Sequence, residues 1–531
     1  MITYRYIRAA LALASTYGSS AAATCAPPPV PITIGNSTLS NNQVARGLQV
    51  SIGNPPQPFV FLPQWPLNNT FVYGTDGHCT FSAAGCTTRR GGAYDMLASK
   101  SRSVADKSSY PSDSAPFPPM SFVSDTFSLG QEANLSGFPL GIPLNDWGEE
   151  DYHPMNAVGL GDNSTLLRTL KSTGKIASRA WSMFWGRNGA LASAQLDGIF
   201  VLGGYDKAKT QGQPLALPLA DNTDKCPTRM LITISDLILN FSNGTNASLF
   251  PKAASNAIQA CIVPDYPVLM TLPLDPYFGN FETLTNQSLP DRSLGLVYFA
   301  NRYSSNDNVY TGDLTINFES GFSVRIPNDQ LVVPHRQIDT TTGEITANAT
   351  GPDLVILSTQ DINKNDITQL GRQFLSAAYL MVNLDANQFT LWEANPTDTR
   401  QLVAVDETNA EIASVCDGNS PPPPSPPPVT HPDGGGSGSS LSSGAIAGIA
   451  VAVVAFIVIV SAILFVWRRR QRRSAAGGIS DKFPPHTYGY NNGVQYQGSS
   501  GEQVYKPPQA PGELPVPEPG QRVESRRYEL Q

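Results

Sequence analysis

Histidine is scarce in this 531-residue chain, and the signature motifs of several enzyme classes are missing. The five histidines are scattered and no Cys-x-x-Cys pair occurs, so the sequence predicts no zinc site. Neither Gly-x-Ser-x-Gly nor His-Glu-x-x-His occurs, and there is no glycine-rich phosphate loop. These absences exclude the hydrolases, zinc proteases and nucleotide-binding enzymes that such motifs mark. We therefore expect neither a metal nor a cofactor.

Charge is also sparse, because only 15% of the residues are charged, and the formal net charge is −8. From residue 468 onward there are ten basic and six acidic residues, a net charge of +4, which leaves −12 for the rest of the chain. An acidic protein of this kind repels a phosphate backbone. We therefore expect no nucleic-acid partner.

Both ends of the chain carry targeting signals. Residues 1–23 hold Arg5 and Arg8, an apolar run and a terminal Ala-Ala-Ala, as in a secretory signal peptide. Residues 445–467 carry no charge and are long enough to cross a bilayer, and five arginines follow within residues 468–473. Basic residues stay on the cytoplasmic side, so the preceding part lies outside. The sequence thus predicts a single-pass type I protein of the cell membrane.

The composition around the predicted span agrees with this topology. Residues 401–443 contain a proline run and then a Gly/Ser run, which predicts a stalk. Residues 468–531 are rich in Pro, Gly, Gln, Tyr and Ser, which predicts a disordered cytoplasmic tail. Its PxxP-like spacing at residues 508–519 is either an adaptor-binding site or a plain linker. The glycosylation sequons all precede the span, at Asn36, Asn68, Asn134, Asn163, Asn240, Asn243, Asn246, Asn286 and Asn348.

Short apolar runs between turns predict an antiparallel β-sheet in the exterior part. The stretch 50–72 contains two such runs around a Gly-Asn-Pro-Pro turn, and it resembles the hairpin that leads into the first catalytic loop of pepsin-like aspartic proteases. Gln64 stands where that family has its aspartate, and Pro66 stands where it has glycine. No Asp-Thr-Gly or Asp-Ser-Gly occurs in the chain.

A second stretch, residues 260–273, resembles the second catalytic motif of the same family. Pro264 stands at the aspartate, and Asp265 and Tyr266 replace the threonine and glycine that follow. The region of the family's flap, residues 112–119, is rich in proline and therefore stiffer than a glycine-containing tip.

Scaffold motifs of the family follow in the expected order, so the resemblance runs from about residue 43 to residue 393. They are a hydrophobic-Gly element at residues 156–161, a short helix after it at residues 164–171, a strand at 180–185, a Gly-Gly hairpin at 197–206, and closing segments at 370–375 and 379–385. The resemblance implies an all-β, bilobal fold with an N-terminal lobe at residues 24–215 and a C-terminal lobe at 216–400.

The chain has six cysteines, all before the predicted span, which favours disulfides. The resemblance to the pepsin-like family implies a bond between Cys79 and Cys86. The other four cysteines allow three connectivities. Among these we favour Cys226–Cys261 and Cys25–Cys416.

Aspartic proteolysis needs two carboxyl groups, one acting as base toward water and one as acid. Gln64 cannot take a proton and Pro264 has no functional group. We expect the side chain of Asp265 to point away from Gln64, because successive strand residues face opposite sides.

We therefore expect a catalytically inactive, glycosylated cell-surface protein. In this interpretation a cleft containing Gln64, Trp65, Asp265 and Tyr266 binds a peptide or glycan. The alternatives are an active membrane-anchored aspartic endopeptidase with an unconventional site and a structural or adhesive surface glycoprotein.

Overall fold

The computed structural model describes residues 25–416, apart from residues 66, 76–78, 80–83, 106–107, 109, 111–118, 131–132, 146–154, 222–224, 252–256 and 295–298. The predicted signal peptide, membrane span and cytoplasmic tail lie outside the described residues, as do Pro66 and most of the predicted flap. Within the described part, no helix is both long and apolar enough to cross a membrane.

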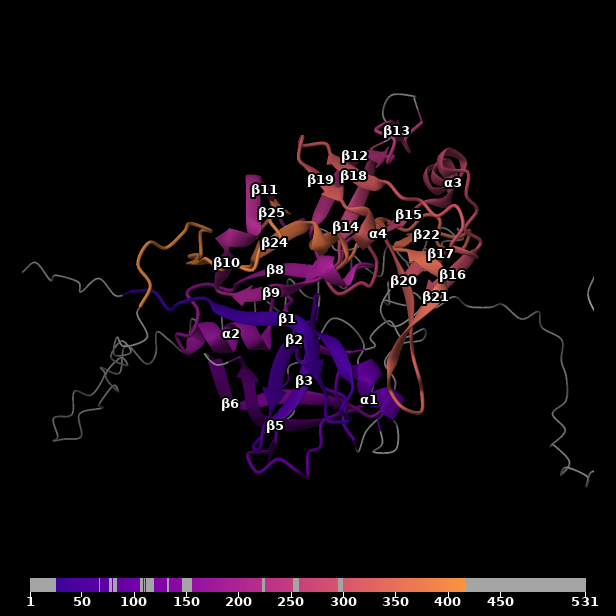
Figure 1. Ribbon diagram of the computed structural model, residues 1–531. Helices are drawn as coiled ribbons and strands as arrows, with labels where there is room; N and C mark the ends of the chain where they lie inside the picture. Colours follow the sequence, from indigo (N-terminus) through magenta and orange to yellow (C-terminus); the bar gives the residue numbers. More distant parts are fainter. Residues whose placement is uncertain are drawn as a thin grey trace, which may run out of the picture. The chain divides into compact units, whose positions relative to one another are not determined.

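A 12-stranded sheet is the largest element of the described structure, and most of its strands come from the first half of the chain (Figure 1). Most of these strands bury one or both faces in a core rich in Val, Ile, Leu and Phe, whereas the two residues of β4 are exposed. The strands are β1 (Val30–Thr38), β2 (Val44–Ile52), β3 (Gln57–Gln64), β4 (Ser103–Val104), β5 (Met120–Leu129), β6 (Ala133–Pro143), β7 (Asn156–Gly159), β8 (Ala180–Arg187), β9 (Leu196–Leu202), β11 (Thr210–Pro218), β24 (Ala378–Asn383) and β25 (Gln388–Ala394).

The second half of the chain forms an eight-stranded and a four-stranded sheet among the described residues. The larger one contains β12 (Leu231–Asn240), β13 (Asn246–Ser248), β14 (Ile258–Ile262), β15 (Met270–Leu272), β18 (Asp313–Phe318), β19 (Ser323–Ile326), β22 (Ile356–Ser358) and β23 (Thr368–Leu370). The smaller one contains β16 (Asp291–Leu294), β17 (Phe299–Arg302), β20 (Val332–Ile338) and β21 (Ile345–Leu354). The prediction of an all-β fold with two lobes is confirmed.

The two halves share a sheet, because β24 and β25 from the end of the chain join the 12-stranded sheet beside β8. The described helices are short: α1 (Ala84–Arg90), α2 (Thr165–Ser172), α3 (Gly279–Thr285) and α4 (Asn328–Leu331). Helix α2 is the helix predicted at residues 164–171, and its first turn is capped by Ser164, whose hydroxyl accepts from the amide of Leu167.

The Gly-Gly stretch at residues 197–206 is not the hairpin that the sequence predicts. Strand β9 pairs with β1 and β8, whereas β10 (Gly204–Asp206) leaves the sheet and pairs with β26 (Leu402–Ala404). Gly203 has a φ of 78°, which lets the chain turn away there, and Gly204 lets the carbonyl of Val403 approach closely. Residues 401–416, which the sequence assigns to the stalk, are therefore folded against the domain.

Three disulfide bonds join all six cysteines: Cys79–Cys86, Cys226–Cys261 and Cys25–Cys416. Each pairing agrees with the one favoured from the sequence. Cys25 and Cys416 lie at the two ends of the described chain, where Ala26 and residues 414–416 exchange backbone hydrogen bonds.

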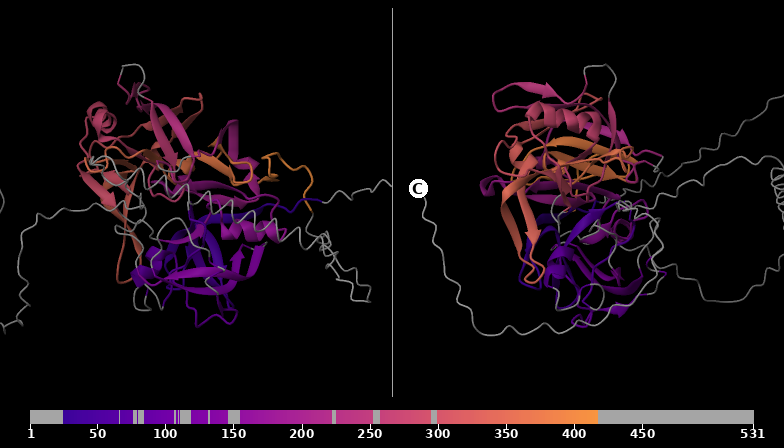
Figure 2. Two further views of the ribbon diagram at one scale, coloured as in Figure 1. Left: turned by 180° about the vertical axis from the view of Figure 1, so that it is seen from behind. Right: turned by 90° about the vertical axis from the view of Figure 1, so that its right-hand side faces the viewer.

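The hairpin of β20 and β21 reaches from the C-terminal half to α1 in the N-terminal half (Figures 1 and 2). The contact at its tip is close, since a Cβ atom added at Gly85 would lie 2.7 Å from the carbonyl oxygen of Thr340. The absence of a side chain at Gly85 thus allows the hairpin to pack on the helix.

Candidate functional site

Gln64 is the last residue of β3, and its backbone is paired with the neighbouring strand β7. The two strands run parallel, with Gln64 opposite Gly159, and the carbonyl of Gln64 accepts from the amide of Leu160 at 2.8 Å. The hydrophobic-Gly element therefore lies behind the position that replaces the first aspartate, as the sequence motif predicts. The side chain of Gln64 is buried, with 3% of the residue exposed.

Asp265 faces Gln64, contrary to the expectation from strand alternation. The Nε2 group of Gln64 donates to Oδ2 of Asp265 at 3.1 Å. Strand β14 ends at Ile262, and the amide of Tyr266 bonds to the carbonyl of Val263. Asp265 therefore lies in a turn, where the side chains do not alternate between two faces.

The Gln64–Asp265 pair contains one ionisable group, and both residues are buried. Asp265 is 6% exposed, and burial raises the pKa of its carboxyl group to about 6. The hydrogen bond from Gln64 and the positive charge of Arg372 oppose this shift. Among the described residues, Oδ1 of Asp265 has no hydrogen-bond partner. The pair can hold a proton on Asp265, but the amide of Gln64 cannot exchange one.

The other residues expected in a cleft are part of the packed interior. Trp65 is 3% exposed and lies 6.2 Å from Trp181, measured between ring centroids. Tyr266 is 5% exposed and contacts Phe299 edge-on at 5.6 Å. Pro264 is also buried. The structure thus brings Gln64 and Asp265 together but packs Trp65 and Tyr266 against other aromatic rings.

A cavity of about 250 Å³ lies close to this pair, between the ends of β1 and β2 and the β20–β21 hairpin. Its lining includes Arg46, Arg336 and Arg372, together with Trp185 and Ile345. Neither Gln64 nor Asp265 lines it, but Arg372 links the two places, because its Nη1 donates to the carbonyl of Asp265 at 3.2 Å. Motif reasoning did not single out these arginines. One of them could have been noticed in the sequence, because Arg372 stands where the closing motif of the family has aspartate.

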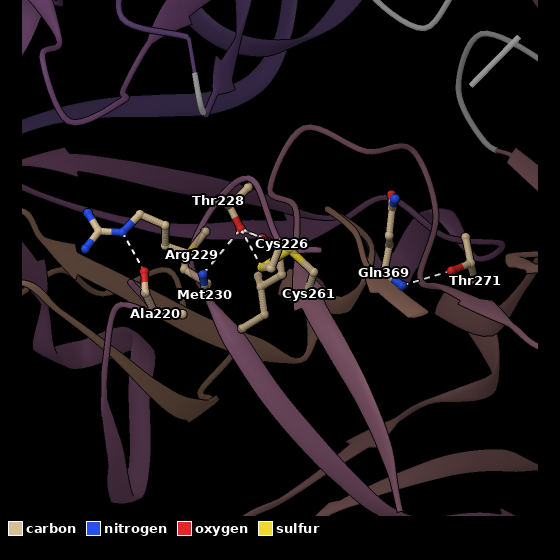
Figure 3. The surroundings of a disulfide bond; sticks show 9 residues. Ala220, Cys226, Thr228, Arg229, Met230, Cys261, Thr271 and Gln369 are labelled. Carbon is tan, nitrogen blue, oxygen red and sulfur yellow. Dashed lines mark hydrogen bonds between the residues drawn. A yellow bond between two sulfur atoms is a disulfide. The ribbon is translucent and has the colours of Figure 1, made fainter. Parts of the chain in front are cut away.

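The Cys226–Cys261 bond fixes the strand that leads to Asp265 (Figure 3). Thr228 lies beside both sulfur atoms, and its hydroxyl donates to the carbonyl of Ile262 at 2.6 Å. Between β23 and β15, the backbone amide of Gln369 donates to Oγ1 of Thr271 at 2.8 Å (Figure 3). These contacts hold β14 in place just before the turn that carries Asp265.

The nine sequon asparagines all lie in the described part, and none is buried. Asn68 and Asn240 are half-buried, and the other seven are exposed. In the same part of the chain, no group of three or more His, Cys, Asp or Glu side chains is placed to hold a metal ion.

Comparison with known proteins returns secreted aspartic proteases. The chain is 23% identical over 261 residues to Candidapepsin-3 of Candida albicans strain WO-1 and to Secreted aspartic protease 3 of Candida albicans. The match covers 48% of this chain and spans only 54% of the length of these curated relatives. Among solved structures, an aspartic proteinase from Irpex lacteus is 14% identical, with a TM-score of 0.44, covering 70% of this chain and 99% of that one. No protein-family profile matches the chain. The similarity to the Candida proteases, together with the two β-rich lobes, supports the resemblance to the pepsin-like aspartic proteases that the sequence motifs indicate.

Proposed function

We propose that this chain is a pepsin-like protein without protease activity that binds an extended ligand at the cell surface. The observation that carries the proposal is the 3.1 Å contact between the amide of Gln64 and the carboxyl group of Asp265. In a pair of carboxyl groups, one acts as the acid and the other as the base, whereas an amide can neither donate nor accept the proton. The single remaining carboxyl group has no partner with which to share a proton.

Burial of the two residues further supports this proposal. Attack on a peptide bond needs a water molecule and a substrate carbonyl next to the catalytic groups. Gln64 and Asp265 are only 3% and 6% exposed, so neither residue is open to water and substrate. The pair therefore acts as a buried link between the lobes.

The proposed location is the cell membrane, with the lobes outside and the tail in the cytoplasm. Support comes from the uncharged segment at residues 445–467 and the arginines after it, and from the accessibility of the sequon asparagines. In this arrangement the partners are an extracellular ligand and, through the proline-rich tail, a cytoplasmic adaptor.

The proposal is tested by incubating the purified full-length chain with denatured casein between pH 3 and pH 7, with and without an aspartic-protease inhibitor. We expect no inhibitor-sensitive cleavage, while an active pepsin-like enzyme added to a parallel sample cleaves fully. An Asp265→Asn variant is the matched control. Inhibitor-sensitive cleavage that disappears in this variant would overturn the proposal and assign the chain as an active aspartic endopeptidase.

A further inference from the structure

The cavity beside the Gln64–Asp265 pair carries an unusual charge for this protein. Its lining contains three arginines and no aspartate or glutamate, in a chain whose net charge is −8. The arginines come from three separate parts of the fold: Arg46 from β2, Arg336 from the β20–β21 hairpin and Arg372 from the loop after β23. The fold thus gathers positive charge here against the overall charge of the molecule.

Neighbouring groups hold the guanidinium groups of Arg46 and Arg372 in place. Arg46 donates from Nη2 to the carbonyls of Trp185 and Leu196, each at 3.0 Å. The guanidinium carbons of Arg46 and Arg372 lie 5.9 Å and 5.3 Å from the centroid of the Trp185 ring. The two guanidinium groups are held against one indole ring at the wall of the cavity. Hydrogen-bond donors that are already held in place lose less conformational entropy when a ligand binds.

Arg336 is the most available of the three charges. It is half-buried, and its Nη2 donates to the carbonyl of Asn188 at 3.4 Å. Among the described residues Arg336 forms no ion pair, whereas Arg46 lies 3.4 Å from Oδ1 of Asp197. A guanidinium group that faces a cavity without a carboxylate partner is suited to accept one from a ligand.

The size and lining of the cavity favour an acidic side chain over a sugar. About 250 Å³ is less than a typical small-molecule pocket, so it has room for one or two side chains of a ligand that lies mostly outside. Trp185 is 2% exposed, so it offers no open aromatic face on which a sugar ring could stack. Val44 and Ile345 add apolar surface for the methylene groups of a glutamate.

We propose that this cavity binds a carboxylate side chain of an acidic peptide, so that the extended ligand of the proposed function is an acidic polypeptide segment. This inference rests on the proposed function, because a binding protein needs its ligand intact. Binding is held by charge-assisted hydrogen bonds from the arginines and weakens as the salt concentration rises.

The test uses the full-length chain and fluorescent hexaglutamate, with hexaglutamine and a galacturonate hexamer as comparisons, read by fluorescence anisotropy. We expect hexaglutamate to bind and hexaglutamine not to bind. Arg336→Gln should weaken hexaglutamate binding about tenfold, and Arg336→Lys should weaken it less. The matched control is Arg325→Gln, because Arg325 pairs with Asp313 and does not line the cavity. That variant should bind like the unmodified chain.

Three results would overturn the inference: no binding of hexaglutamate, equal weakening by Arg325→Gln, or tighter binding of the galacturonate hexamer than of the peptide. Melting temperatures of all variants show whether a loss of binding reflects a loss of fold. Mass spectrometry of the peptide separates this inference from the proposed function. Cleaved hexaglutamate would contradict the proposed function, whereas intact and unbound hexaglutamate would contradict the inference alone.

Discussion

Asp265 is a buried carboxyl group that accepts a side-chain hydrogen bond from the neutral amide of Gln64. Burial is the main cause that raises its pKa to about 6. In the folded protein the carboxyl group is therefore mostly protonated below about pH 6. An unfolded aspartate ionises near pH 4. Between these two values the folded state binds more protons than the unfolded state, and stability therefore falls as the pH rises.

We predict that Asp265→Asn stabilises the protein near neutral pH and has little effect below about pH 4. The asparagine keeps an oxygen for the Gln64 hydrogen bond but carries no charge to desolvate. A shift of about two pKa units corresponds to a gain of at most about 3 kcal/mol in the free energy of unfolding at pH 7. The measurement is the melting temperature of both proteins from pH 3.5 to pH 7.5.

Asp385→Asn is the control for this experiment because the sign of its pH dependence is opposite. Burial disfavours ionisation of Asp385, but hydrogen bonds from Arg179 and Lys171 outweigh it and lower its pKa. Its contribution is present above the unfolded pKa and is lost as the pH falls through the folded value. Asp385→Asn should therefore destabilise the protein at neutral pH. If both variants show the same pH dependence, the assignment of Asp265 as a destabilising charge is wrong.

Sequence reasoning located Gln64 but not its partner. The β2–β3 hairpin around Gly53 has one register, since a slip by one residue would expose its hydrophobic face, and this places Gln64 at the end of β3. Residues 263–266 carry no such pattern. A turn allows Pro264 or Asp265 to face the other lobe, and only the three-dimensional path of the chain decides between them.

Among the elements, the β20–β21 hairpin is one that the motifs did not predict. The packing of this hairpin depends on Gly85, a residue far from it in sequence. A contact between distant residues produces no pattern in the local sequence. Strand β26 was missed for the same reason, because its partner β10 is about 200 residues earlier in the chain. By contrast, the hydrophobic-Gly element and α2 have local signals, and both were predicted.

We predict that Gly85→Ala displaces the tip of the hairpin from α1. The new methyl group would meet the carbonyl oxygen of Thr340 at 2.7 Å, which forces a shift costing about 1–3 kcal/mol. Amide hydrogen exchange in residues 339–344 should become faster, and the melting temperature should fall.

Gly279→Ala is the matched control, since Gly279 also lies in the first turn of a seven-residue helix. The nearest atom to its added Cβ, the carbonyl oxygen of Leu274, is at 3.5 Å, an ordinary contact. This variant should be as stable as the unmodified chain or slightly more stable. Unchanged exchange at the hairpin tip in Gly85→Ala would contradict the proposed packing.

At the scale of the whole molecule, the disulfides and the sequons both support the proposed extracellular location of the lobes. All six cysteines are paired, and the described asparagines of the sequons are accessible to a modifying enzyme. The pairing of four of these cysteines was open to three arrangements from the sequence alone, because connectivity depends on the fold.

We predict that the chain carries N-linked glycans before residue 445 and that its C-terminus is cytoplasmic. Treatment with an N-glycosidase should increase the gel mobility of the full-length chain expressed in secreting eukaryotic cells. An epitope placed after Gln531 should resist protease added to intact cells. Digestion of this epitope from outside would reverse the proposed orientation.

The bond between Cys25 and Cys416 joins the two ends of the described chain, so residues 25–416 form a covalent ring. A break in one peptide bond anywhere between these cysteines opens the ring but releases no fragment, because each half stays attached through the sulfur atoms. In the proposed membrane-anchored arrangement, release of the lobes therefore requires a cut beyond Cys416. Nicked and intact molecules remain the same size until the disulfide is reduced.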